Sequence, residues 1–178
     1  MTLKKINSFV EKIEEWILKY GIIILAVLTV GNVISRRLFN QSWAFTTEAS
    51  QFLLVLITFM GISYGVRKGR HIRMTALYDS LNEKWQKIFM IIISSVTAVI
   101  LFFLAYHSAR FVLSAFQDGR VTPALQVPFY LVIMWAPIGL ILGGIQYFLT
   151  LIKNLTSEGV WLSYEEKEGY KELDYVNN

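Results

Sequence analysis

Four long apolar segments dominate this chain of 178 residues. They run from about residue 16 to 38, from 49 to 66, from 88 to 106 and from 129 to 152. Each can cross a bilayer as a helix, because about 20 apolar residues cover the roughly 30 Å of hydrocarbon. A helix also satisfies its own backbone hydrogen bonds, which hydrocarbon cannot do. The sequence therefore predicts an all-α integral membrane protein with four transmembrane helices.

The residues before the first span have a different pattern. Apolar residues recur there at steps of three and four, and charged residues occupy the positions between them. This spacing predicts an amphipathic helix over residues 1–16, lying in the headgroup plane. A helix packed on the cytoplasmic face of a partner is the alternative. The following apolar run begins late and lacks an A-x-A cleavage pattern, so we expect it to be retained and not cleaved as a signal peptide.

The distribution of basic residues predicts the orientation. Thirteen of the 17 Lys and Arg residues fall in the N-terminal segment, in the loop between the second and third spans, or in the tail. Basic residues flanking spans favour the cytoplasmic side, so both termini and the 67–87 segment should be cytoplasmic. We expect a four-helix transmembrane domain at residues 17–153 and a mobile, acidic cytoplasmic tail at 154–178.

Composition argues against catalysis. Charged residues make up 17% of the chain, less than the quarter or so that is typical of soluble domains, so they are too few to cover a water-facing surface. The chain has no cysteine, and its two histidines, His71 and His107, lie far apart without a carboxylate cluster beside them, so we expect no metal site. Phosphate-binding glycine loops and the H-E-x-x-H and G-x-S-x-G motifs are absent. We therefore expect neither an enzyme nor a cofactor, and no nucleic-acid partner.

Ionisable residues inside a membrane are the usual functional candidates, and here they lie only at the ends of the spans. Glu48 begins the second span. It could pair with Arg36 or Arg37 or contact a partner subunit, or it could be a solvated carboxylate near a helix N-terminus. Arg67 and His71 belong to a basic run that is typical of a topology signal contacting anionic lipid.

Small residues four positions apart occur in two spans. They allow close helix approach, either inside the bundle or against another protein. Pro137 lies within the last span and should kink it. The two pairs are Gly61 with Gly65, and Gly139 with Gly143.

Several of these features occur in one order, and together they resemble a known family. That family is the small membrane subunit, or Q subunit, of tripartite ATP-independent periplasmic (TRAP) transporters, and the resemblance covers roughly residues 17–150. The chain departs from the family at Thr47, where a second acid is usual, and at Met74-Thr75, where an acid is usual. The matching elements are Asn32 and Arg36, Trp43, Thr47-Glu48, Gly61, Arg67-Lys68-Gly69-Arg70-His71-Ile72, Pro123 to Pro128, and Trp135 to Gly139.

The resemblance implies a role in a bacterial cytoplasmic membrane. In this family the small subunit pairs with a large multi-span subunit, which moves substrate by an elevator-like motion driven by a sodium gradient. A soluble periplasmic binding protein delivers the substrate, an organic acid such as a dicarboxylate or a sialic acid. The small subunit is expected to be a static scaffold in contact with phospholipid. Trp43, Glu48, Arg36, Arg37, Arg67 and His71 are then the candidates for contact with a partner or with lipid.

A self-sufficient four-helix transporter or exporter is the alternative function. Small exporters of that kind need a carboxylate inside the first span. The first span here contains Thr29 and Asn32 but no acid. The sequence thus favours the scaffold.

The orientation can be tested with single cysteines at Ser80 and Gln117. An impermeant thiol reagent applied to intact spheroplasts should label position 117 and not position 80, because basic flanks retain the 67–87 segment in the cytoplasm. The opposite labelling pattern would show that the orientation is inverted.

Overall fold

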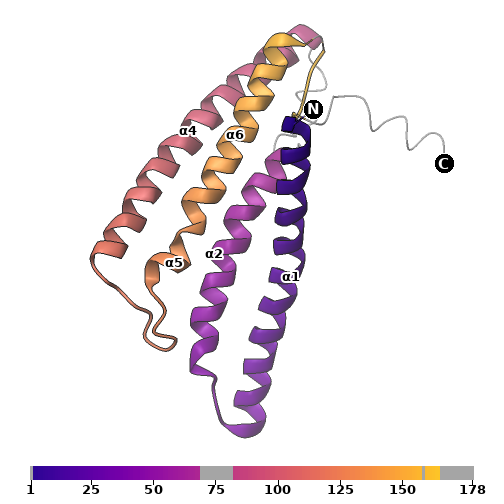
Figure 1. Ribbon diagram of the computed structural model, residues 1–178. Helices are drawn as coiled ribbons and strands as arrows, with labels where there is room; N and C mark the ends of the chain where they lie inside the picture. The colour runs from indigo at the N-terminus through magenta and orange to yellow at the C-terminus, as the bar shows by residue number, and fades with distance from the viewer. Residues whose placement is uncertain (1, 69–81, 158, 165–178) are drawn as a thin grey trace, which may run out of the picture. The chain divides into compact units, whose positions relative to one another are not determined.

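The computed structural model describes residues 2–68, 82–157 and 159–164. Four stretches within these ranges are long and apolar enough to cross a membrane, which confirms the four predicted spans. The last of them is divided between two helices, so five helices follow one another in this part of the chain (Figure 1). They are α1 (Thr2–Phe39), α2 (Ala44–Arg67), α4 (Glu83–Gln117), α5 (Phe129–Ile133) and α6 (Trp135–Thr156).

Two of the helices extend well beyond the predicted spans. The helix α1 has 38 residues and runs without a break through the predicted junction near residue 16, so the amphipathic segment and the first span are one helix. The helix α4 has 35 residues and continues to Gln117. At about 1.5 Å per residue these helices measure about 57 Å and 52 Å, longer than the hydrocarbon is thick. The structure does not show the N-terminal part lying in the headgroup plane, and an unbroken helix carries this part along the axis of the first span.

The last span is broken where its proline predicts. Pro137 has no N–H, so the carbonyl of Ile133 has no donor four residues on, and the proline ring crowds that carbonyl. The chain makes a turn at Met134, whose N–H binds the carbonyl of Tyr130 at 2.9 Å. Pro137 therefore divides the span into α5 and α6.

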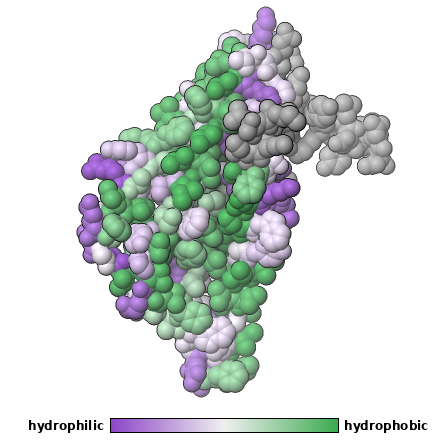
Figure 2. Space-filling view, viewed as in Figure 1, coloured by the Kyte–Doolittle hydropathy of each residue, from purple (hydrophilic) through white to green (hydrophobic). Residues whose placement is uncertain are grey.

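The chain forms two compact units. The first contains Met1–Gly61 and Ala105–Gly139, and the second contains Ile62–Leu104 and Leu140–Asn178. Apolar side chains cover most of the helical surface that is visible in Figure 2. In the first unit they include Val27, which is 65% exposed, and in the second Val99, which is 66% exposed. Such surfaces are stable in hydrocarbon and unstable in water.

In each unit, one of the predicted small residues allows helices to approach closely. In the first unit, a Cβ at Gly139 would collide with the backbone carbonyl of Phe59 on α2. In the second unit, a Cβ at Gly143 would lie 3.3 Å from Ile62 and 3.5 Å from Leu101. Gly61 has ordinary room, because its nearest neighbour is Leu18 at 3.6 Å. Gly65 lies one turn further along α2. Gly139 and Gly143 thus serve packing within the chain.

Gly139 should therefore be much less tolerant of a methyl group than Gly61. We expect Gly139→Ala to cost about 1–3 kcal/mol, since rigid backbone and not a flexible side chain opposes the new atom. Gly61→Ala is the matched control and should change stability little. Thermal unfolding of both purified variants in detergent measures the difference, and equal melting temperatures would contradict the close approach.

Candidate functional site

Glu48 joins α2 to the loop between α4 and α5 in the first unit. It is the fifth residue of α2. One carboxylate oxygen accepts the N–H of Ala124 at 2.6 Å, and the other accepts the N–H of Leu125 at 2.8 Å. The side chain of Thr122 also hydrogen-bonds to this carboxylate. We call this arrangement the Glu48 latch.

The loop is shaped so that both N–H groups are available to one carboxylate. Val121 and Pro128 pair as an isolated β-bridge, and the N–H of Thr122 donates to the carbonyl of Val127 at 2.9 Å. Between them Gln126 adopts a positive φ of 54°, which closes the turn. Successive N–H groups that point the same way form an anion-binding concavity. In this loop the anion is a side chain of the same protein.

The latch corrects the expected partner of Glu48. In the described part of the chain the carboxylate is bonded to the 122–125 turn, and no ion pair joins it to Arg36 or Arg37. Both arginines are exposed in the last turn of α1, where a positive charge interacts favourably with the helix dipole. Of the alternatives for Glu48, the ion pair with Arg36 or Arg37 is thus not formed in the described residues, and contact with a partner subunit stays a prediction.

Trp43 stabilises the turn between α1 and α2. Its backbone N–H donates to the amide oxygen of Asn32 at 2.9 Å, and the hydroxyl of Ser42 contacts the same oxygen at 3.4 Å. Its ring lies over Gly31, where a Cβ would come within 3.2 Å of two ring carbons. The ring also stacks on Phe45, with centroids 6.1 Å apart. The 40% of Trp43 that stays exposed is available to another molecule.

The basic run after α2 is described only at its start. Arg67 is the last residue of α2 and is 1% exposed, in the second unit. A guanidinium buried to this extent points to a role within the fold and argues against direct contact with lipid. His71 lies outside the described residues.

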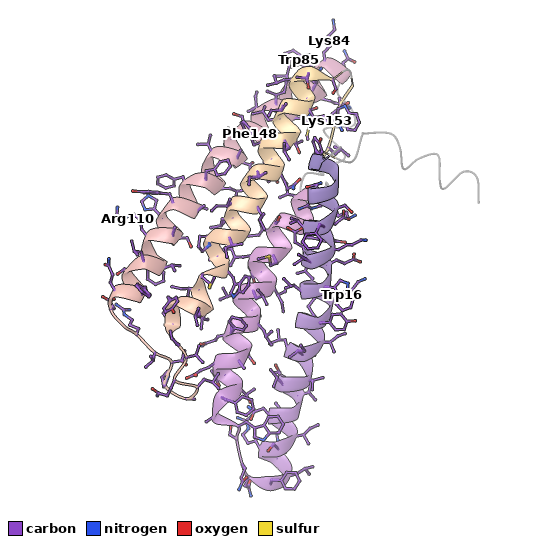
Figure 3. All side chains as sticks on the ribbon, in the orientation of Figure 1. Trp16, Lys84, Trp85, Arg110, Phe148 and Lys153 are labelled. Atoms are coloured by element: carbon purple, nitrogen blue, oxygen red, sulfur yellow. The ribbon has the colours of Figure 1, made fainter. Side chains whose placement is uncertain are left out.

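Sequence reasoning missed a cluster at the end of α6 in the second unit. The side chain of Asn154 is fully buried and bonds both the N–H and the carbonyl of Trp161, at 3.0 and 2.8 Å. Lys153, marked in Figure 3 near the end of α6, lies 3.6 Å from the centroid of the Trp161 ring and donates to the carbonyl of Tyr164 at 2.7 Å. Lys87 donates to the carbonyl of Ser157 at 2.9 Å. Residues 159–164, assigned by the sequence to the tail, are therefore bound to α6.

The described residues offer no obvious cation site. Within them, no three His, Cys, Asp or Glu side chains lie close enough together to hold a metal ion. The carboxylate of Glu48 is bonded within the Glu48 latch. The amide oxygen of Asn32 is bonded within the turn that contains Trp43. Both arrangements fix loops, and neither presents a reactive group to a substrate.

The latch can be tested by replacing Glu48. In Glu48→Gln the side chain retains one acceptor oxygen, so at least one of the two N–H groups loses its charged partner. The amides of Ala124 and Leu125 should then exchange with deuterium faster, as measured by mass spectrometry on peptides covering 118–128.

Arg37→Gln is the matched control for that experiment, because it removes a charge from the neighbouring helix end. It should leave exchange in 118–128 unchanged. If Arg37→Gln accelerated exchange as much as Glu48→Gln does, the result would contradict the latch and indicate that an ion pair between Glu48 and Arg37 orders the loop.

Comparison with known proteins identifies the family of the chain. Residues 25–157 match the family model described as tripartite ATP-independent periplasmic transporters, DctQ component. The chain is 43% identical over 172 residues to the ectoine TRAP transporter small permease protein TeaB of Halomonas elongata, covering 97% of this chain and 89% of that protein.

More distant relatives match a shorter stretch. The chain is 26% identical over 88 residues to the C4-dicarboxylate TRAP transporter small permease protein DctQ of Vibrio cholerae, covering 49% of this chain and 38% of that protein. It is 25% identical over 105 residues to the sialic acid TRAP transporter permease protein SiaT of Haemophilus influenzae, covering 58% of this chain and 17% of that protein. The protein therefore belongs to the DctQ family, the small permease component of tripartite ATP-independent periplasmic transporters, and it is a transport protein and not an enzyme.

Proposed function

We propose that this small permease anchors and scaffolds a large, elevator-type permease subunit in the cytoplasmic membrane. The assembled transporter takes up an organic acid that a periplasmic binding protein delivers, and a sodium gradient drives the uptake. In this arrangement the chain holds the large subunit at a fixed depth and itself binds neither ion nor substrate.

One observation carries the proposal: the middles of all four spans lack charged side chains. The uncharged stretches are residues 20–35, 49–66, 88–106 and 135–152. Charged side chains at membrane depth are costly, and where they occur they usually mark the pathway of an ion or an anionic substrate. A subunit without charged side chains at that depth is suited to support and not to translocation.

The match to SiaT supports a large partner. The 105 matched residues make up only 17% of that permease, so the related segment is part of a much longer chain. If the two parts form a permanent one-to-one assembly, we expect them to occur joined in one chain in some relatives. We propose that the longer part is here a separate subunit, as the words small permease protein indicate for TeaB.

The substrate is set by the other subunits, and the relatives suggest which to test first. TeaB is described as part of an ectoine TRAP transporter, and it matches nearly the whole of this chain. The DctQ proteins are named for C4-dicarboxylates but match about half of it. Ectoine is therefore the first candidate.

The N-terminal part of α1 supports anchoring at the cytoplasmic interface. Trp16, which projects outward in Figure 3, is 62% exposed, and its ring lies 4.8 Å from that of Tyr20, which is 49% exposed. Lys19 pairs with Glu15 at 2.6 Å one turn away. Aromatic rings beside charged groups favour the headgroup region, where phospholipid would surround this end of the helix.

A self-sufficient transporter would need free polar or charged side chains in the first span to bind its substrate. The hydroxyl of Thr29 donates to the carbonyl of Leu25 at 2.7 Å. The amide oxygen of Asn32 binds the Trp43 turn. Both polar side chains are committed to bonds within the chain, which leaves the scaffold as the better-supported function.

We expect the purified chain, reconstituted alone, to take up no ectoine under a sodium gradient. Addition of the large permease and the binding protein should start sodium-dependent uptake, because the ligands for ion and substrate lie on those proteins. Radiolabelled uptake into proteoliposomes measures both conditions. Uptake by the chain alone would overturn the scaffold function in favour of the alternative.

A further inference from the structure

A polar stripe runs along α2 on a surface that nothing in the first unit covers. Residues 47, 51, 54 and 58 recur at steps of four, three and four, so they share one side of the helix. All four are exposed, and they are Thr47, Gln51, Leu54 and Thr58. We call this the α2 stripe.

Two members of the α2 stripe lie deep in the hydrocarbon. Taking α2 as the span Ala44–Arg67, Gln51 lies about 7 Å and Thr58 about 4 Å from its middle at 1.5 Å per residue. The hydrocarbon extends about 15 Å to either side of the middle. Both side chains are thus too deep to reach the headgroups.

The amide of Gln51 has no partner within the described part of the chain. By contrast, the polar side chains of Thr29 and Asn32 on α1 of the same unit are paired locally. Lipid tails offer no hydrogen bonds, so an amide facing them would be left unsatisfied. A polar group in this position favours coverage by another protein, because interhelical hydrogen bonds are a main attraction between membrane helices.

The exposed side of α4 in the second unit is different. Its exposed side chains at mid-span are apolar: Ile92, Val96, Val99, Ile100, Phe102, Phe103 and Leu104. Of its polar side chains at this depth, Ser94 is fully buried and Ser95 and Thr97 are half-buried. An all-apolar exposed surface is stable against lipid, and it requires no protein partner.

We propose that the α2 stripe is the docking surface for the large permease subunit, and that the exposed side of α4 faces lipid. The occupant of the stripe is a transmembrane helix of the large subunit that presents hydrogen-bonding or small side chains opposite Gln51 and Thr58. The proposal rests on the scaffold function and adds where on this chain the large subunit binds.

Photo-crosslinking in the assembled transporter tests the assignment. A benzoylphenylalanine is placed singly at position 51, 58, 92 or 99, and the chain is co-expressed with its large permease. We expect irradiation to join the large permease to positions 51 and 58 and not to positions 92 and 99. Mass spectrometry of each adduct identifies the second protein.

Two substitutions by the bulky residue tryptophan test the same surface through the affinity of the chain for the large permease. Thr58→Trp should lower co-purification of the large permease at least about tenfold, a loss of about 1.4 kcal/mol in association free energy. Val99→Trp is the matched control and should leave it unchanged. Monodisperse elution and unaltered circular dichroism of the isolated variants show that the folds are intact; the crosslinking experiment does not depend on these substitutions.

The outcomes separate this inference from the proposed function. If the unmodified chain captures the large permease but adducts form only from positions 92 and 99, the docking surface is wrong and the scaffold function stands. Adducts from 51 and 58 to a second copy of this chain would likewise overturn the assignment. If the unmodified chain fails to capture the large permease at all, the scaffold function falls, and the docking surface falls with it.

Discussion

Water is absent from the hydrocarbon of a bilayer, so polar groups placed there must find partners within protein. Several polar side chains of the structure follow this constraint. The hydroxyls of Thr29 and Thr150 bond back to carbonyls four residues earlier, and Asn32 uses its amide to bind the turn that follows α1. Close contact between α2 and α6 at Gly139 adds dispersion contacts, which substitute for the hydrophobic drive that lipid removes. Against this background Gln51 is an exception that needs a partner.

The parts of the fold that depend on local chemistry were predictable from sequence. Spans follow from runs of apolar residues, and the break before Pro137 follows from a missing N–H. The partner of Glu48 was not predictable, because it depends on how a loop 76 residues away closes. That closure needs a positive φ at Gln126, which a glutamine in the sequence does not predict. The helices α1 and α4 are longer than the predicted spans because a helix continues past the apolar residues that define a span.

The candidate residues divide according to what they contact. Glu48 and Trp43 hold the two loops of the first unit in shape, Arg67 is buried in the second, and Arg36 and Arg37 remain exposed. The role of a static subunit fits such a distribution, because its contribution is rigidity. Asn154 and Lys153 extend the same principle to the end of α6, where they bind a returning segment that carries no sequence signal of its own.

The unbroken course of α1 links the protein to the thickness of its membrane. Its span of 33 residues, Asn7–Phe39, is longer than the hydrocarbon it crosses, and it contains no proline or turn at which to bend. A rod of fixed length in a thinner layer must lean over further or protrude more. A change in bilayer thickness would thus become a change in the tilt of α1, and the lipid composition of the host membrane would help set the angle at which the first helix stands.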